Sequence, residues 1–547
     1  MVTEWPGTSE ADASEVGTAE AGSAEPDAVG ADSVEPDAAE QDTPREECGV
    51  FGVWAPGEEV AKLAFYGLFA LQHRGQEAAG IAVGDGSQVL VYKALGLVSQ
   101  VFDEQVLASL QGHVAVGHAR YSTSGGQGWE NAQPTFRTTS GGRGLALGHN
   151  GNLVNTAELR QRAADERADG PVGNTSAPAR GCEAATTDSD LVCGLLAKRA
   201  EERSLEQAAT ELFPSVHGGF SMVFSDESAL YAVRDPQGVR PLVLGRLERG
   251  WVVASETAAL DIIGGTFVRE VEPGEVLAID ADGLRSSRFA RPNPKGCVFE
   301  YVYLARPDTT ISGRSVHSTR VAIGHRLATE YPAEADLVIP VPESGTPAAI
   351  GYAQESGIPY GNGLVKNAYV GRTFIQPSQT IRQLGIRLKL NPLREVIRGK
   401  RLVVVDDSVV RGNTQRALVR MLRDAGALEV HVRIASPPVR WPCYYGIDFA
   451  SRAELIANGL DLDGVRSSIG ADSLGYVSLD GLVDATEQPR NRLCAACFDG
   501  EYPIPVSDET GTETGQLDRG GSESALVEPA EPVLPNGYGA AEALGRP

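Results

Sequence analysis

Two adjacent carboxylates, Asp406 and Asp407, stand between an apolar run and a loop of small polar residues. The run, residues 402–405, is typical of a buried parallel strand, so polar groups should emerge at its carboxyl end. The carboxylates can bind sugar hydroxyls or a hard cation, and amides of the loop, residues 408–414, can bind a phosphate. This stretch indicates a site for a phosphorylated sugar that is handled with Mg²⁺.

A cysteine, Cys48, directly follows an acidic segment and precedes a β-like run. Taken alone, it is more typical of a buried core residue than of a nucleophile. Three other stretches favour a nucleophile. Arg120 ends a β-like run with a guanidinium that suits a carboxylate, and Asn150 and Gly151 offer the ingredients of an oxyanion hole. Asp188 offers an acceptor for an amine.

Together these stretches resemble the class II glutamine amidotransferases, whose glutaminase domain belongs to the N-terminal nucleophile hydrolases. The resemblance implies that Cys48 is the nucleophile and that Asn150 and Gly151 form the oxyanion hole. It also implies that glutamine is bound by three side chains, those of Arg120, Thr123 and Asp188.

One part of this match leaves an alternative open. A polar stretch at residues 160–183, which we predict to be a surface insertion, precedes Asp188. The alignment of Asp188 with the family motif is ambiguous because of this insertion. Asp190 is therefore a second candidate for the partner of the glutamine amine.

The place of Cys48 in the chain bears on its activation. An α-amino group has a pKa of about 7.7–8 and can act as the base for the thiol of its own residue. In the full-length chain, that amine is part of the peptide bond after Glu47. We therefore predict that residues 1–47, an acidic segment of disordered composition, are a propeptide that is removed before activity.

The stretch at residues 402–414 resembles the phosphoribosyl pyrophosphate (PRPP) signature of the type I phosphoribosyltransferases. Without this resemblance, a purely structural strand-to-helix turn is the alternative. In that family the two aspartates contact the ribose hydroxyls and the Mg²⁺ site, and the loop binds the 5′-phosphate. Residues 342–345 resemble the second metal and pyrophosphate loop, although Glu343 stands where an aspartate is common.

The same resemblance extends to a basic segment, residues 371–392, which is a candidate lid. It implies one Mg²⁺ ion per subunit, at Ser344, Asp406 and Asp407. The PRPP-binding residues that it implies are Ser344, Lys366, Arg372, Lys389, Asp406, Asp407, Ser408, Arg411, Gly412, Asn413 and Thr414.

The elements that position these residues form two domains with different patterns. Residues 48–291 are predicted as an α+β domain with the αββα layers of an N-terminal nucleophile hydrolase. Residues 292–505 are predicted as an α/β phosphoribosyltransferase domain with a doubly wound parallel sheet, and residues 506–547 as a disordered tail. Strands are predicted at residues 80–83, 114–118, 145–148, 221–224, 251–255, 337–340, 402–405 and 429–434. Helices are predicted at residues 60–71, 190–203, 205–213, 316–331 and 414–425.

A glutaminase followed by a type I phosphoribosyltransferase resembles the amidophosphoribosyltransferase family over residues 48–505. The resemblance implies the first step of purine synthesis: glutamine is hydrolysed through a thioester, and the ammonia passes internally to C1 of PRPP. The products would be 5-phosphoribosylamine, pyrophosphate and glutamate. Inhibition by purine nucleotides and a homotetramer are implied in the same way.

The C-terminal half contains a Cys-x-x-Cys pair and two further cysteines. One branch of the family has a propeptide and a [4Fe–4S] cluster held by four cysteines at matching places, here Cys297, Cys443, Cys494 and Cys497. Four thiolates suit such a cluster or tetrahedral zinc, and the spacing does not decide between them. Structural cysteines with a redox pair are the remaining alternative. Cys182 has no assigned role, and Cys193 lies on a helical pattern typical of a core.

Composition narrows the function classes. The chain of 547 residues has a net charge of −25, of which residues 1–47 carry −13. The charge gives no support for a nucleic-acid partner. The sequence contains no apolar run near the roughly 20 residues that span a bilayer, and no secretory signal, so we expect a cytoplasmic protein.

A non-catalytic nucleotide-binding regulator on the same scaffold is the alternative function. A glucosamine-phosphate synthase would lack the Asp406–Asp407 loop.

Overall fold

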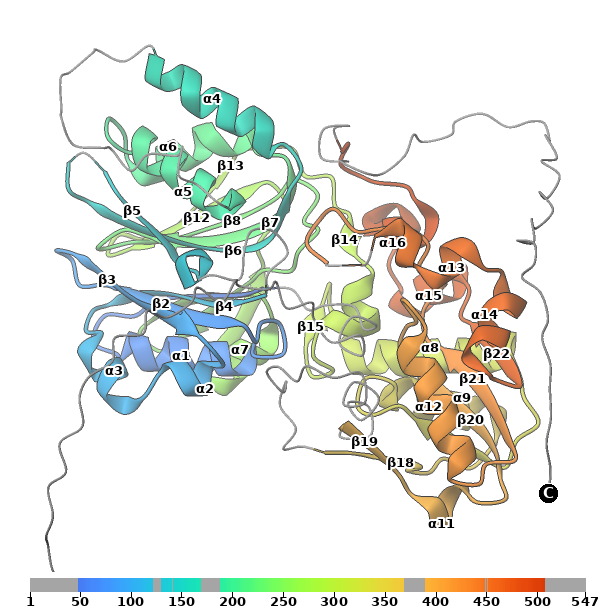
Figure 1. Cartoon of the computed structure of the whole chain (residues 1–547). Helices are drawn as coiled ribbons and strands as arrows, with labels where there is room; N and C mark the ends of the chain where they lie inside the picture. Colours follow the sequence, from blue (N-terminus) through green and yellow to red (C-terminus); the bar gives the residue numbers. More distant parts are fainter. Residues whose placement is uncertain are drawn as a thin grey trace, which may run out of the picture. The chain divides into compact units, whose positions relative to one another are not determined.

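The structure is a computed structural model that describes residues 48–121, 129–139, 141–168, 187–367, 389–447, 449 and 451–506 (Figure 1). All of them belong to one of the two compact units of the chain, Ala38–Pro547. The predicted propeptide, residues 507–547 of the predicted tail, and the candidate residues Thr123, Arg372 and Cys182 lie outside the described residues.

The N-terminal domain contains two stacked antiparallel sheets. One sheet has the strand order β11-β9-β10-β1-β4-β2-β3, and the other has the order β13-β12-β8-β7-β6-β5. The first comprises β1 (Gly49–Trp54), β2 (Ala78–Gly84), β3 (Val89–Leu95), β4 (Val114–Arg120), β9 (Val243–Leu247), β10 (Gly250–Ala254) and β11 (Thr266–Glu270). The second comprises β5 (Thr135–Thr138), β6 (Gly144–Leu153), β7 (Gly218–Ser225), β8 (Leu230–Arg234), β12 (Glu275–Asp280) and β13 (Gly283–Arg288).

Helices cover the outer faces of both sheets, which confirms the predicted αββα layers (Figure 1). The alternation of side chains along β1 shows why: Val50 packs between the sheets, whereas Phe51 and Val53 pack under the helices. The helices of the first sheet are α1 (Val60–Ala70), α2 (Val98–Val101), α3 (Glu104–Ser109) and α7 (Thr257–Ile262). Those of the second are α4 (Thr156–Ala168), α5 (Asp188–Arg199) and α6 (Leu205–Leu212).

The C-terminal domain is built on a parallel sheet with the order β17-β20-β21-β22. Its strands are β17 (Leu337–Pro340), β20 (Arg401–Asp406), β21 (Glu429–Ile434) and β22 (Ser473–Tyr476). A parallel bridge joins Val338 to Tyr360 on the other side of β17, so the chain winds in opposite directions from that strand. The carboxyl ends of β17 and β20 therefore meet where the winding reverses, which is where open α/β sheets bind ligands.

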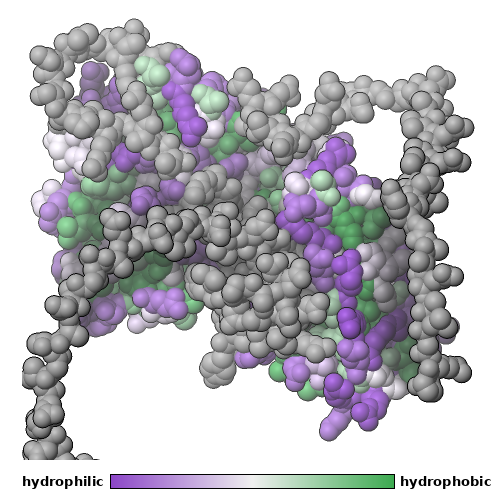
Figure 2. All heavy atoms as spheres, in the orientation of Figure 1, coloured by the Kyte–Doolittle hydropathy of each residue, from purple (hydrophilic) through white to green (hydrophobic). Residues whose placement is uncertain are grey.

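Both faces of this sheet are covered. Val403 and Val405 pack towards α8 (Val316–Glu330) and α9 (Thr346–Ser356), whereas Leu402 and Val404 pack towards α12 (Asn413–Asp424) and α14 (Leu462–Ile469). The opposite side of α12 exposes arginines, and the surface around it includes a hydrophilic band (Figure 2). The doubly wound arrangement predicted from the sequence is confirmed. No helix among the described residues is long and apolar enough to cross a membrane.

The remaining elements join the domains or flank the sites. They are β14 (Gly296–Cys297), the π-helix η4 (Glu300–Leu304), β15 (Thr310–Ile311), β16 (Arg314–Ser315), β18 (Leu364–Lys366), β19 (Leu390–Pro392), α11 (Arg394–Ile397), α13 (Ile456–Gly459), α15 (Leu479–Thr486), β23 (Leu493–Cys494) and α16 (Ala496–Asp499). The 3₁₀ turns are η1 (Trp129–Asn131), η3 (Phe213–Ser215), η5 (Arg452–Glu454) and η6 (Arg490–Arg492).

Two element predictions need correction. Residues 160–168, predicted as part of a polar insertion, belong to helix α4. Helix α5 begins at Asp188 rather than at residue 190, because the side chain of Thr187 caps it by accepting a hydrogen bond from the Asp190 amide at 3.2 Å. The polar composition of α4 removes the apolar period from which a helix is predicted.

Candidate functional site

Cys48 lies at the start of β1, against the end of β4. Its neighbour Gly49 pairs with Ala119, one residue before Arg120. The thiol donates to the carbonyl of Tyr121 at 3.3 Å, and the amide of Tyr121 approaches the sulfur at 3.5 Å. The thiol is buried, and so is Arg120, the last residue of β4. The pairing of β1 with β4 thus brings the predicted nucleophile and the predicted carboxylate ligand to one end of the sheet.

Asn150 lies in the middle of β6, in the second sheet, with its side chain fully buried. Neither atom of its side-chain amide has a hydrogen-bond partner among the described residues. Leaving a buried polar group without a partner costs about 1–3 kcal/mol. A ligand that accepted a hydrogen bond from Asn150 would remove this cost.

A histidine connects β6 to the strand that carries Arg120. His118, on β4, is completely buried, and this burial lowers its pKa to about 3, so the ring is neutral. A neutral ring can donate from Nε2 to the carbonyl of His149, 3.0 Å away. This bond fixes the spacing between Arg120 and Asn150, which belong to different sheets.

The two aspartates proposed for the glutamine amine have different surroundings. Asp188 is buried and accepts hydrogen bonds from the amides of Ser189 at 2.7 Å and Leu153 at 3.2 Å. Burial alone would raise the pKa of Asp188, but His149 and these amides hold it below the ordinary value. Asp190 instead forms an ion pair of 2.5 Å with Arg137 on β5. A carboxylate oxygen of Asp188 lies 3.7 Å from the ring of His149, the residue before Asn150, which favours Asp188.

Asp406 and Asp407 lie at the carboxyl end of β20, as predicted. Both are buried, and Asp406 accepts from the amide of Asp407 at 3.0 Å and from the side chain of Gln415. Ser408 donates to Asp407 at 2.5 Å. The pKa of Asp406 is raised well above its ordinary value, chiefly by burial and secondly by the nearby charge of Asp407. Two adjacent buried carboxylates make a site that a cation would stabilise.

The loop with Ser344 follows β17 and lies beside these carboxylates. The amide of Val341 donates to the carbonyl of Val405 at 2.8 Å, which continues the pairing of β17 with β20. A Cβ atom added to Gly345 would lie 2.4 Å from the carbonyl oxygen of Val405 and 3.2 Å from Cα of Asp406. The structure therefore brings the two predicted metal loops together.

The loop after Asp407 ends at the N-terminus of α12. Gly412, the residue that precedes the helix, has a φ of +81° and no side chain with which to cap it. Backbone amides at a helix N-terminus form a site for a phosphate. The guanidinium of Arg411 pairs with Glu454 at 3.1 Å, and Asn413 accepts from Arg416 at 3.1 Å.

The lysines of the PRPP prediction lie on, or next to, a separate two-stranded sheet of β18 and β19. Lys366 is exposed and ends β18, and Lys389 precedes β19. The carbonyl of Lys389 accepts from the amide of Asn367 at 2.9 Å. The segment between them, which contains Arg372 and most of the predicted lid, lies outside the described residues.

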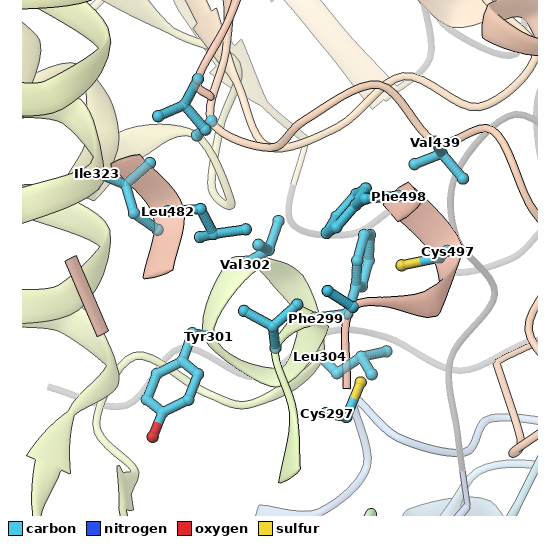
Figure 3. Packing of buried hydrophobic residues seen from close by; sticks show 14 of the residues in the cluster. Cys297, Phe299, Tyr301, Val302, Leu304, Ile323, Val439, Leu482, Cys497 and Phe498 are labelled. Carbon is cyan, nitrogen blue, oxygen red and sulfur yellow. The ribbon is translucent and has the colours of Figure 1, made fainter. Parts of the chain in front are cut away.

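Four cysteines from three segments of the chain line one small cavity. Cys297 and Cys494 are paired neighbours on parallel strands β14 and β23, and Cys497 lies on α16. The sulfur of Cys443 accepts from the amide of Tyr445 at 3.4 Å. Figure 3 shows the sulfurs of Cys297 and Cys497 among aromatic rings, which include Phe299 and Phe498 with centroids 6.0 Å apart.

The chemistry of these thiols fits a metal cluster. Burial raises the pKa of Cys494 to about 12, and burial with the neighbouring cysteines raises that of Cys497 well above its ordinary value. A bound metal centre would supply the positive charge that ionises them. Among the described residues, no three His, Cys, Asp or Glu side chains converge closely enough for a single metal ion. Cys193, which lies on α5, is buried in the hydrophobic core beside that helix, as predicted.

A buried ion network was not predicted from the sequence. Arg74 contacts Glu256 and binds Glu300 at 2.6 Å, and Glu256 also accepts from Thr309 at 2.6 Å and from the amide of Arg306 at 2.9 Å. The network therefore crosses from the N-terminal domain to the π-helix of the C-terminal domain. In the sequence, Arg74 is 182 residues from Glu256 and 226 residues from Glu300. No local sequence pattern therefore indicates these contacts.

Comparison with known proteins agrees with this arrangement. Residues 118–261 match the family model of a glutamine amidotransferase domain, and residues 316–436 match that of a phosphoribosyl transferase domain. The chain is 73% identical to an amidophosphoribosyltransferase of Mycobacterium bovis over 86% of this chain and 88% of that protein. It is 50% identical to one of Synechococcus elongatus over 86% of this chain and 93% of that protein.

Two solved structures are similar over most of the chain. One is glutamine PRPP amidotransferase from Bacillus subtilis complexed with ADP and GMP, at 44% identity and a TM-score of 0.76. The match covers 84% of this chain and 98% of that chain. The other is described as the allosteric regulatory enzyme of purine biosynthesis, at 44% identity and a TM-score of 0.77, covering 85% of this chain and 97% of that chain.

Proposed function

Since the chain belongs to the amidophosphoribosyltransferase family, we propose that Cys48 releases ammonia from glutamine and that the Asp406–Asp407 loop holds the PRPP that accepts it. The reaction of the family is glutamine-dependent amination of PRPP in purine biosynthesis, and the chain is such an enzyme. The observation that carries the residue assignment is the pair of sites: a buried thiol beside Arg120, and two carboxylates at the switch point of a parallel sheet.

At the first site, the thiol of Cys48 attacks the amide carbon of glutamine. The α-amine of Cys48, once free, takes the thiol proton and passes it to the departing ammonia. The unpartnered amide of Asn150 and the backbone amide of Gly151 donate to the oxyanion. Arg120 and Asp188 hold the α-carboxylate and α-amine of glutamine, with Thr123 as a further ligand. Water then hydrolyses the thioester and releases glutamate.

At the second site, the amides of residues 408–414 and the N-terminus of α12 bind the 5′-phosphate of PRPP. Asp406 and Asp407 bind the ribose hydroxyls. With Ser344 they would hold Mg²⁺, which when bound neutralises the charge of the pyrophosphate leaving group. Ammonia attacks C1 of PRPP as the bond to pyrophosphate breaks. The further PRPP ligands, Lys366, Arg372 and Lys389, stay predictions, as does the use of Arg411, whose guanidinium is already paired with Glu454.

The propeptide assignment gives a prediction about the mature chain. The amine of Cys48 can act as a base only after the bond to Glu47 is cut. Intact mass spectrometry of the purified active enzyme is expected to show a chain that begins at Cys48. An active preparation in which every chain still carries Glu47 would contradict the assignment.

We also propose that Cys297, Cys443, Cys494 and Cys497 hold a [4Fe–4S] cluster rather than zinc. The four thiols line one small cavity, which supports a metal centre, and the resemblance to the cluster-containing branch of the family favours a cluster over zinc. Anaerobically purified enzyme is expected to be brown and to contain about four iron atoms per chain. A colourless enzyme with one zinc per chain would contradict this prediction.

Other parts of the family resemblance remain proposals for this chain. The Bacillus subtilis relative was solved with ADP and GMP, which supports inhibition of this enzyme by purine nucleotides. The homotetramer is proposed from the resemblance alone, and the cytoplasmic location from the sequence and from the biosynthetic role of the family.

The release of glutamate, measured with and without PRPP, tests the function against the alternative of a non-catalytic regulator. An enzyme that couples two sites should release glutamate faster when PRPP is bound. A protein that binds PRPP but releases no glutamate under either condition would be a regulator.

A further inference from the structure

A segment of the C-terminal domain, residues 443–446, lies directly against the strand that carries the oxyanion hole. The side-chain amide of Asn152 on β6 donates to the carbonyl of Tyr444 at 3.1 Å. A Cβ atom added to Gly446 would lie 3.0 Å from Cα of Gly151. The segment begins at Cys443, one of the four cysteines that line the small cavity. One short stretch thus contacts both the cysteine cavity and the oxyanion hole.

The packing between these parts leaves no space for adjustment. A Cβ atom added to Gly219 on β7 would lie 2.9 Å from Cβ of Tyr445, and one added to Gly151 would lie 2.0 Å from the carbonyl oxygen of Gly219. The backbone of Gly446 therefore packs against that of Gly151, and the backbone of Gly151 packs against that of Gly219. Because close-packed groups transmit displacements, a shift of Gly446 must move Gly151.

A second connection returns to the oxyanion hole from the other side. The fully buried Arg240 donates from Nε to the carbonyl of Tyr445 at 2.9 Å. The carbonyl of Arg240 accepts from Ser221 at 3.1 Å, and Ser221 pairs with Asn150 across β6 and β7. Hydrogen bonds and contacts thus form a closed ring that includes both Asn150 and residues 443–446.

We propose that residues 443–446 are a positioning element of the glutaminase site. Through the contacts of Gly446 with Gly151 and of Tyr444 with Asn152, they fix the geometry in which the oxyanion meets its donors. The segment begins at Cys443, so it is also tied to the four-cysteine cavity at its other end. The inference rests on the assignment of Asn150 and Gly151 given under the proposed function.

The first test is Gly446→Ala, because the new methyl group would press on Gly151. The loss of one oxyanion donor costs about 10²–10³ in kcat, so a displaced donor should cost about 10- to 100-fold. The KM for glutamine is expected to stay within about twofold, because Arg120 and Asp188 are not displaced. Synthesis from PRPP and added ammonia, the iron content, and the alkylation rate of Cys48 by iodoacetamide should not change.

Gly283→Ala is the matched control. Gly446 and Gly283 both have a φ beyond the ordinary left-handed region, at +126° and +106°, but a Cβ atom on Gly283 would have no neighbour within 4 Å. This control introduces comparable backbone strain without the contact, so its kcat with glutamine should match that of the parent.

The second variant, Asn152→Ala, removes the bond to Tyr444 without adding bulk. We expect kcat to fall about threefold to tenfold, again with little change in KM. Both variants should also bind glutamate γ-semialdehyde, whose adduct with Cys48 carries an oxyanion, more weakly by the same factors as the losses in kcat. The proposal is overturned if both variants keep kcat within twofold of the parent. It is also overturned if ammonia-dependent synthesis and iron content fall together with kcat, since that result would show general loss of structure.

The variant Asn150→Ala separates this inference from the proposed function. If it lowers kcat strongly while Gly446→Ala and Asn152→Ala do not, the oxyanion hole is correctly assigned and only the positioning role fails. If Asn150→Ala has no effect on glutamine hydrolysis, the assignment under the proposed function fails as well.

Discussion

Replacing Cys48 by alanine is expected to lower glutamine-dependent synthesis by on the order of 10⁴-fold or more, because the loss of a covalent nucleophile removes the whole thioester route. Synthesis from added ammonia should stay within about twofold of the parent rate, because the PRPP site at β20 is built without Cys48. Pyrophosphate release with each nitrogen source measures both activities on one preparation.

Cys193→Ala provides the matched control for this experiment, since Cys193 is also a buried cysteine of the N-terminal domain but packs in the core around α5. It should retain glutamine-dependent synthesis. Equal loss of glutamine-dependent and ammonia-dependent synthesis in Cys48→Ala would contradict the assignment of Cys48 to the glutaminase alone.

Replacing Asp407 by asparagine should instead lower both activities, by about 10²- to 10³-fold. The change keeps the shape of the side chain but removes charge from the place where the ribose and Mg²⁺ are expected, so PRPP is no longer held for attack. PRPP should also lose its stimulation of glutamate release. Rates of pyrophosphate release with glutamine and with ammonia, at saturating Mg²⁺, give the measurement.

Asp463→Asn is the control for the loss of a carboxylate in this domain. Asp463 is exposed and forms an ion pair of 2.9 Å with nearby Arg466. Exposed ion pairs contribute little to the free energy of unfolding. Its activity should equal that of the parent. If Asp407→Asn keeps full activity with ammonia, the PRPP site lies elsewhere.

The sequence predicted those elements whose apolar pattern is bounded by clear breaks. Strands β17 and β21 match the predicted residues, because each is a short run rich in branched side chains between polar ends. Strand β22 was not predicted, because its residues, Ser473–Tyr476, include a serine and a glycine and no β-branched side chain. Helix α4 was not predicted, because only Leu159 and small alanines interrupt its polar sequence, too few apolar residues to show a helical period.

The positions of candidate site residues were predictable where these residues stand at the end of a predicted strand. Asp406 and Asp407 follow their strand directly, and Arg120 ends β4 in the same way. Contacts between distant parts of the chain were not predictable. The hydrogen bond of Asn152 with Tyr444 joins residues that are 292 positions apart, and the lack of a partner for Asn150 within the described part of the chain depends on packing between sheets.

The central claim is that one chain couples glutamine hydrolysis at Cys48 to amination at the Asp406–Asp407 loop. The most direct test is to measure glutamate and pyrophosphate together on the processed enzyme, purified without air and supplied with glutamine, PRPP and Mg²⁺. The account predicts one pyrophosphate for each glutamate, with both products absent in Cys48→Ala unless ammonia is added. Glutamate release without a matching release of pyrophosphate would contradict it.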